Sequence, residues 1–171
     1  YIEIYNPTGN MLRLDDYYLT DDPLAYIDVP TGSTTLSDNS RFITRFPRGA
    51  RLGPGEYQVI AVDSAAYLAE FSTPTTYEIT QDGSADMVDD MVALSGPVSG
   101  GVLLNPGELV TLFRWDQIGD LVQDVDVMVW GSPAVCPEKF GQSRDGPATG
   151  LTATPYLDDG CTLTAPAAGT A

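Results

Sequence analysis

The amino-acid sequence predicts an all-β fold, a sandwich of short antiparallel strands with long loops and one short helix. Two observations lead to this fold class. Short segments with apolar residues at every second position recur along the chain, and clusters of Gly, Pro, Asn and Asp separate them at intervals of about eight to twelve residues. Roughly seven to nine such strands form the pattern of a β-sandwich.

The first predicted strands flank a turn at the start of the chain. A strand over 2–6 has Ile2 and Ile4 on one face, and a strand over 11–14 repeats the alternation. The intervening Asn-Pro-Thr-Gly has turn chemistry, because proline presets φ and glycine tolerates positive φ. We therefore expect the two strands to form a hairpin, and a third strand to follow at 17–19.

A long polar stretch comes next. Proline and glycine interrupt 20–40, which predicts a loop with a short strand near 25–29. Apolar alternation resumes in a predicted strand over 42–46.

A turn, a strand and the only predicted helix follow. Pro54 and Gly55 suit the centre of a type II turn that leads into a strand over 57–62. Ser64 is the predicted N-cap of a short helix over 64–71, where alanines and other helix-forming residues end before a proline.

The second half of the chain predicts a hairpin. A short strand is expected at 77–80, and 81–101 reads as an acidic connection. The strands over 109–115 and 121–130 flank a short turn and complete the predicted set.

Length and composition indicate one globular domain. The chain has 171 residues, of which 43% are hydrophobic, so one core is expected over 1–163, with 164–171 as a linker or frayed end. No apolar run is long enough for a membrane span, so membrane insertion is not expected.

The charge is strongly negative. With 24 acidic and 8 basic residues the net charge is −16, which disfavours binding to nucleic acid. Lys139 is the only lysine. This composition, with Tyr1 at the start and no signal-peptide pattern, leads us to expect a mature or excised form of an exported bacterial protein, secreted or on the cell surface.

Two cysteines fit an oxidising compartment. Cys136 and Cys161 could form one disulfide that closes a loop of ~25 residues, for which the loop-entropy estimate is ~3–4 kcal/mol. The alternative is two unpaired thiols. With no histidine and no C-x-x-C motif, a zinc site is not expected.

Several sequence runs together resemble the bacterial lamin-tail domain over nearly the whole chain. The runs are EIYNPTG at 3–9, YYLTDD at 17–22, RFPRGARLGPGEYQVIAV at 45–62, LNPGELVTLF at 104–113, DVDVMVWG at 124–131 and SRDGPATGLTATPYLDDG at 143–160. The resemblance implies an immunoglobulin-like sandwich. It also implies a non-catalytic interaction or tethering module. The aromatic-Arg strand that often closes bacterial members is not seen, so an exposed sheet edge could support self-assembly or pairing with another surface protein.

Catalysis is not expected. Without histidine, Ser-His-Asp and Cys-His arrangements cannot form, and a two-carboxylate glycosidase is the arrangement that stays formally possible. We interpret most of the carboxylates as solvated surface groups.

Acidic clusters in loops read first as a solvated acidic face, and the alternative is that they could bind calcium. Carboxylate oxygens are the ligands that Ca²⁺ prefers, although none of these clusters has EF-hand spacing. The candidate ligands are Asp15, Asp16, Asp21, Asp22, Asp82, Asp86, Asp89 and Asp90, with a further pair at Asp158 and Asp159.

Arginines and aromatic residues supply two further hypotheses. Arg41, Arg45, Arg48 and Arg51 lie close together in sequence and could dock an acidic surface of a partner or second copy, or simply pair with neighbouring acids. Four aromatic residues could stack on a sugar or belong to the core. These are Tyr17, Tyr18, Trp115 and Trp130.

The sequence therefore predicts a secreted or cell-surface, non-enzymatic interaction module. The alternative is an accessory domain of a secreted hydrolase that binds Ca²⁺ or glycans.

Overall fold

A computed structural model describes residues 1–81, 86–96, 103, 107–131, 139–148 and 152–157. Most of the regular structure is β-strand, with one α-helix, α1, and one 3₁₀-helix, η1, so the predicted all-β class is confirmed. The elements are β1 (Ile2–Tyr5), β2 (Leu12–Arg13), β3 (Tyr17–Thr20), η1 (Ala25–Thr31), β4 (Ile43–Arg45), β5 (Arg51–Leu52), β6 (Tyr57–Ala61), α1 (Ser64–Phe71), β7 (Tyr77–Glu78), β8 (Asp89–Asp90), β9 (Val92–Ser95), β10 (Gly107–Arg114), β11 (Gln123–Gly131), β12 (Ser143–Arg144) and β13 (Thr154–Pro155).

Two larger sheets form the body of the molecule. A five-stranded sheet has the order β11-β10-β3-β4-β9, and a four-stranded sheet has the order β1-β6-β7-β8. Two short ribbons pair β2 with β5 and β12 with β13. The prediction of purely antiparallel strands is wrong for β6, β7 and β8, which are parallel. After β6 the chain returns through α1, and such a crossover is what a parallel pair requires.

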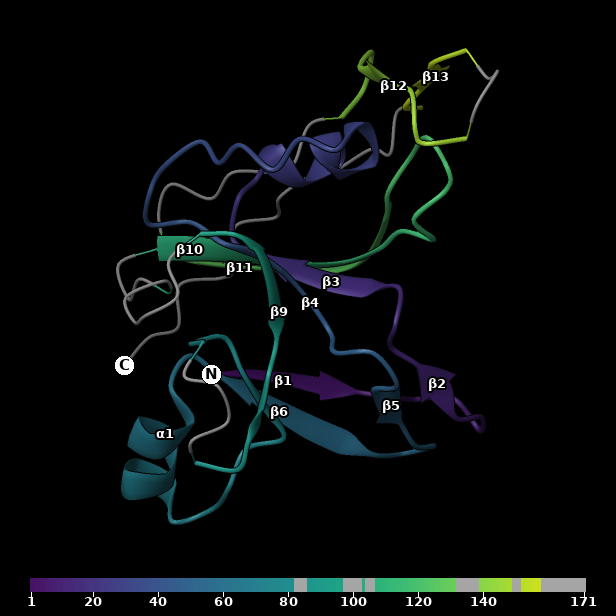
Figure 1. Cartoon of the computed structure of the whole chain (residues 1–171). Helices are drawn as coiled ribbons and strands as arrows, with labels where there is room; N and C mark the ends of the chain where they lie inside the picture. The colour runs from purple at the N-terminus through teal and green to yellow at the C-terminus, as the bar shows by residue number, and fades with distance from the viewer. Residues whose placement is uncertain (82–85, 97–102, 104–106, 132–138, 149–151, 158–171) are drawn as a thin grey trace.

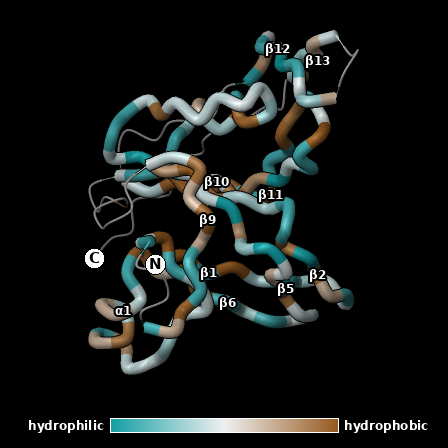
Figure 2. Tube along the Cα trace, viewed as in Figure 1, coloured by the Kyte–Doolittle hydropathy of each residue, from teal (hydrophilic) through white to brown (hydrophobic). Residues whose placement is uncertain are grey.

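The main core lies between the two sheets. Ile4 on β1 and Ile60 on β6 belong to the same buried cluster as Leu19 on β3 and Val110 on β10, with Phe46 beside them. In Figure 1 the four-stranded sheet lies below the five-stranded sheet. Figure 2 shows hydrophobic and hydrophilic residues mixed along these strands, as expected when one face of a strand is buried.

The five-stranded sheet is buried on its other face as well. Tyr18 stacks on Phe113 with ring centroids 5.0 Å apart, and both side chains pack with Tyr26 and Ile27 of η1. Tyr26 is 0% exposed. The 3₁₀-helix therefore covers this face (Figure 1).

The predicted hairpin at the start of the chain does not form. Strand β1 pairs with β6, and β2 pairs with β5. Buried Asn6 explains the arrangement, because its Nδ2 donates to the carbonyl oxygens of Leu52 (3.1 Å) and Gly53 (2.9 Å) as well as to Asn10 (2.7 Å). The turn is thus fixed against the later strands rather than closing on itself.

The short strand predicted near 25–29 is instead η1. The Asp22 carboxylate accepts hydrogen bonds from the backbone N–H groups of Leu24 (3.0 Å) and Ala25 (2.7 Å), which favours a helical turn over an extended chain.

The helix predicted over 64–71 has the expected bounds, but its predicted cap is wrong. Asp63 is the N-cap, because its side chain accepts a hydrogen bond from Ala66 N–H at 2.8 Å. Ser64 is buried, and its N–H donates to the Glu78 carboxylate at 2.9 Å.

The later strands are partly as predicted. The hairpin of β10 and β11 is confirmed, and the type II turn is supported by Gly55 at φ +68 with Glu56 N–H bonded to Gly53 at 3.1 Å. The connection predicted over 81–101 instead contains β8 and β9.

The tail at 164–171 lies outside the described residues. Among the helices that the structure describes, none is long and apolar enough to cross a membrane.

Candidate functional site

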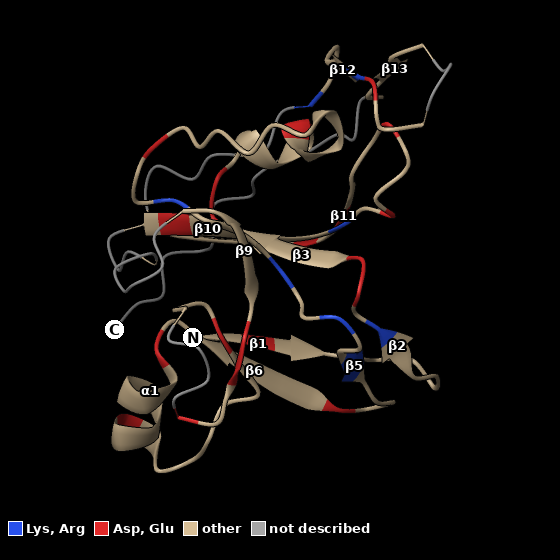
Figure 3. Ribbon diagram, in the orientation of Figure 1, with Lys and Arg blue, Asp and Glu red and all other residues tan. Residues whose placement is uncertain are grey.

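Basic residues gather at one end of the molecule, around β2, β5 and the end of β4 (Figure 3). A pocket of about 780 Å³ opens there. Four of the eight basic residues of the protein line it, Arg13, Arg45, Arg48 and Arg114. The other lining residues are Met11, Leu12, Asp15, Asp16, Tyr17 and Gln117. We call this site the arginine pocket.

Strand pairing in the five-stranded sheet brings two of the arginines together. Strand β3 lies between β4 and β10, and both neighbours run antiparallel to it. Arg45 is the register partner of Tyr18, and Arg114 is the partner of Tyr17. Because β3 begins where β4 and β10 end, Arg45 and Arg114 lie at the same end of the strands.

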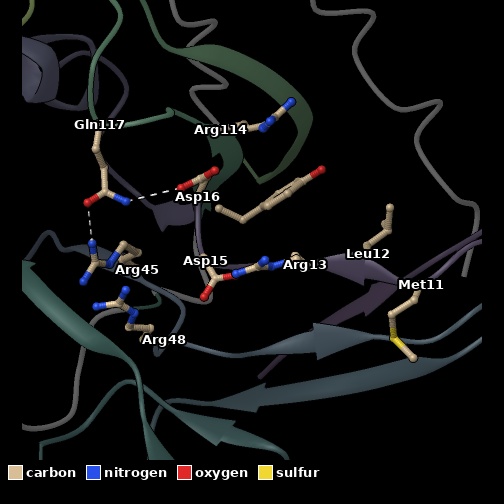
Figure 4. A pocket seen from close by; sticks show the side chains of 10 residues that line it. Met11, Leu12, Arg13, Asp15, Asp16, Arg45, Arg48, Arg114 and Gln117 are labelled. Atoms are coloured by element: carbon tan, nitrogen blue, oxygen red, sulfur yellow. Dashed lines mark hydrogen bonds and ion pairs between the residues drawn. The ribbon is translucent and has the colours of Figure 1, made fainter. Parts of the chain in front are cut away.

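The other two arginines come from strand β2, which carries Arg13, and from the β4–β5 connection, which carries Arg48. Asp15 joins these segments, because its carboxylate accepts hydrogen bonds from Gly49 N–H (2.7 Å) and from Arg13 Nε (3.0 Å). These two bonds, that of Gly49 first, hold the pKa of Asp15 below its usual value. Asp15 thus fixes the turn that carries Arg48 (Figure 4).

Gln117 links Arg45 and Asp16 in the lining of the pocket. Its Oε1 accepts a hydrogen bond from Arg45 Nη1 at 3.1 Å, and its Nε2 donates to Asp16 Oδ1 at 3.2 Å (Figure 4). Gln117 has φ +66, a conformation that costs a non-glycine residue about 1–2 kcal/mol. The strained position places this side chain between a basic and an acidic group.

Positive charge in the arginine pocket is incompletely paired. The side chains of Arg48 and Arg114 make no hydrogen bond or ion pair with another described residue, and Arg45 Nε is buried without an acceptor there. Arg13 also lies directly opposite Arg51 in the β2–β5 register, and like charges in such positions repel. A carboxylate or another anion in the pocket would lower this electrostatic cost, and guanidinium groups bind carboxylates through two parallel hydrogen bonds.

The structure separates the four arginines predicted to dock a partner. Arg45 and Arg48 line the pocket, whereas Arg51 is exposed on β5 outside the lining. Arg41 forms an ion pair with Glu108 and donates to the Asp21 carbonyl at 2.6 Å. The sequence reasoning missed Arg13 and Arg114, because only long-range strand pairing brings them to the pocket.

The predicted calcium ligands lie in different places. Asp15 and Asp16 belong to the arginine pocket, and Asp86 accepts hydrogen bonds from Ser64 Oγ and Val88 N–H. Asp82, like the Asp158–Asp159 pair, lies outside the described residues. No three His, Cys, Asp or Glu side chains form a metal-binding group in the described part of the chain. The calcium site stays a prediction.

Asp21 and Asp22 are buried rather than exposed in a loop. The Asp22 carboxylate accepts bonds from Ser37 N–H and Oγ, both at 2.7 Å, in addition to those at the start of η1. Asp21 Oδ1 accepts from Phe42 N–H at 2.6 Å, and burial raises the pKa of Asp21 to about 7. On strand β8, Asp89 is exposed and Asp90 is half-buried.

The four aromatic residues that could have stacked on a sugar do not form one exposed platform, in line with the alternative that they belong to the core. Tyr18 is 1% exposed and belongs to the core between the five-stranded sheet and η1. Trp115 and Trp130 are half-buried, and Trp115 Nε1 donates to the Gly119 carbonyl at 2.7 Å. Tyr17 is the member of this set that lines the arginine pocket.

Cys136 and Cys161 lie outside the described residues, so the disulfide stays a prediction.

Comparisons with protein-family models, with curated proteins and with solved structures found no match. The resemblance to the bacterial lamin-tail domain and its immunoglobulin-like fold is likewise still a prediction.

Proposed function

We propose that the protein is a non-catalytic interaction module, outside the cell or on its surface, that docks an acidic segment of a partner protein in the arginine pocket. One observation carries the proposal. Half of the basic residues converge on a single pocket of a protein whose net charge is −16. Electrostatic complementarity of this kind selects partners and orients them during association.

The surroundings of the pocket favour a short acidic segment over a long polyanion. Asp15 and Asp16 lie among the arginines, and the rest of the protein is strongly negative. A nucleic acid or long sulfated glycan would extend beyond the pocket and be repelled. Two or three carboxylates on a peptide can contact the arginines and end there.

The composition of the pocket supports binding rather than catalysis. Among the described residues its lining contains no Ser, Thr or Cys, and the protein has no histidine to act as a base. The oxygens of Asp15 are occupied by Gly49 and Arg13.

Fluorescence anisotropy with a labelled peptide rich in Asp and Glu tests this proposal. We expect saturable binding that weakens as salt is raised, because exposed charges are screened beyond ~8–10 Å at physiological ionic strength. Replacing both Arg45 and Arg48 with Glu is expected to weaken binding at least about tenfold, which corresponds to ~1.4 kcal/mol.

The single variants Arg48→Glu and Arg51→Glu form a matched comparison, because each changes the net charge by the same amount, and Arg51 is exposed, adjacent to the site and outside its lining. We expect a smaller loss for Arg51→Glu than for Arg48→Glu. Equal losses in both variants would mean that only overall charge matters, and absence of saturable binding to the unaltered protein would refute the proposal.

Self-assembly through sheet edges is the second candidate function. Among the strands described, β1 and β8 are the end strands of the four-stranded sheet, and β11 and β9 are those of the five-stranded sheet. End strands can pair with another chain. Sedimentation velocity over a wide concentration range tests this function, and a constant monomeric sedimentation coefficient would contradict it.

A further inference from the structure

A second concavity, apolar in character, lies between the two sheets beside the arginine pocket. It has a volume of about 610 Å³, with β1 on one side and β10 and β11 on the other. Its walls are formed mainly by aliphatic side chains, including Ile2, Ile4, Val110 and Leu112. Val125 and Met128 on its rim are 48% and 53% exposed. We call it the apolar groove.

The apolar groove and the arginine pocket are neighbours. Leu12 and Tyr17 line both. A peptide segment a few residues long that lies in the groove can therefore extend past these two side chains to the arginines.

One wall of the groove offers unpaired backbone groups. Strand β1 pairs only with β6 among the described strands. Asn6 exchanges backbone hydrogen bonds with the β5–β6 turn, donating to Glu56 (3.1 Å) and accepting from Gly55 (2.9 Å). In an antiparallel pair these bonds alternate, so the backbone groups of Glu3 and Tyr5 face the opposite side. An added strand could bond to them.

We propose that the apolar groove is the second half of the docking site and receives an extended segment of the partner protein. The segment pairs with the free edge of β1, places alternate apolar side chains in the groove and puts an acidic residue in the arginine pocket. This inference deepens the function proposed above and rests on it. The two shared lining residues, Leu12 and Tyr17, place the apolar and basic surfaces side by side, and this commits the site to a segment with both apolar and acidic residues.

Peptide binding by isothermal titration calorimetry tests this inference. One peptide alternates Val and Thr and then carries an Asp-Glu stretch, a second has the two parts in reverse order, and a third keeps the acidic stretch but replaces every Val with Ser. We expect one of the Val-containing peptides to bind at least about tenfold more tightly than the Ser peptide.

Substitutions in the groove test whether the tighter binding of the Val-containing peptide comes from contacts there. Replacing Val125 and Met128 with Ser, which adds no charge, should remove the advantage of the Val peptide and leave binding of the Ser peptide within about twofold. Leu157→Ser is the control, because Leu157 is 82% exposed and lines neither concavity. Circular dichroism and melting temperature establish that each variant is folded.

The outcomes separate this inference from the proposed function. If Val and Ser peptides bind equally well and the Arg45, Arg48 variant binds neither, the arginine pocket stands and the groove proposal fails. If no acidic peptide binds, both proposals fail. Tighter binding of polyphosphate or a sulfated glycan would overturn the protein segment as ligand, and a dimer that forms without peptide and occludes it would make a second copy the occupant.

Discussion

Asp21 and Asp22 are adjacent in sequence and both fully buried, yet their carboxylates titrate differently. Burial raises the pKa of Asp22, but hydrogen bonds from Ala25, Leu24 and Ser37 outweigh it and bring the pKa below its usual value. Asp21 receives one backbone hydrogen bond, from Phe42, and its Oδ2 has no partner among the described residues. Burial therefore dominates there and raises the pKa to about 7 from a usual value of 3.8.

Because the pKa of Asp21 is raised, we expect the protein to become less stable as the pH rises from about 4 through about 7. Over this range the folded protein binds the proton of Asp21 more tightly than the unfolded chain does, so deprotonation favours unfolding. The free energy of unfolding should decline with a slope of up to ~1.4 kcal/mol per pH unit. Urea denaturation of Asp21→Asn should show little of this decline.

Glu70→Gln is the control for this prediction, because Glu70 is exposed on α1 and the substitution removes the same charge. The control should keep the pH dependence of the unaltered protein. Below about pH 4 stability should fall in all three proteins, because Asp15, Asp22 and Asp116 have lowered pKa values and become protonated there. An Asp21→Asn profile that matches the unaltered protein would refute the assignment.

At the scale of elements, the end of β9 packs unusually close to the start of β4. Gly96 has φ +112, and a Cβ atom there would lie 2.4 Å from the Arg41 carbonyl oxygen and 2.6 Å from Phe42 Cα. Only glycine fits both the backbone conformation and the space.

Gly96→Ala should therefore detach the end of β9 from β4. Both the φ value and the backbone clash oppose alanine, so we expect a loss of at least ~2 kcal/mol in the free energy of unfolding. Hydrogen exchange should increase in β9 amides first. Gly9→Ala is the control, because nothing lies within 4 Å of the Cβ position and it should change stability little. Equal melting temperatures of the two variants would contradict this account.

Local pattern predicted the elements better than their partners. Alternation located β1, β3, β4, β6, β10 and β11, and propensity located α1. Strands β8 and β9 were missed, because they are short and acidic or follow no clear alternation. The hairpin error had a different cause: the side chain of Asn6 bonds to residues far along the chain, and no local signal reveals that.

In the candidate site too, local sequence indicated some of the residues, and long-range strand pairing brings in the others. The spacing of Arg45 and Arg48 indicated a basic surface. Arg114 joins it only through the placement of β3 between β4 and β10, and Arg13 only through the pairing of β2 with β5. The burial of Asp22 had a local signal that the sequence reasoning did not use. Asp-Pro followed by apolar residues is typical of the start of a helical turn.

At the scale of the whole molecule, the net charge of −16 opposes the compact state. We expect the melting temperature to rise as NaCl increases from low to physiological concentration, because the Debye length falls from ~30 Å at 0.01 M to ~8 Å at 0.15 M. Differential scanning calorimetry measures this. A melting temperature independent of salt would mean that the acids are locally balanced by the arginines.

The same experiment with divalent salts tests the predicted calcium site. MgCl₂ and NaCl of equal ionic strength give the screening effect, and CaCl₂ adds any specific binding. A further rise with millimolar CaCl₂ alone would support the calcium site. Equal melting temperatures in CaCl₂ and the matched salts, with no heat of binding on titration, would exclude it.

The central strand of the five-stranded sheet is made long before one of its neighbours. Strand β3 ends at Thr20, and β10 begins at Gly107, so a ribosome adding ~5–20 residues per second takes several seconds to supply the missing partner. In the finished protein Leu19 is buried on one face of this sheet and Tyr18 on the other. Until β10 is made, both side chains have an incomplete surface to pack against. Such long-range pairing slows folding and prolongs the exposure of an apolar strand edge. The time during which aggregation threatens this chain is therefore set by the synthesis of β10.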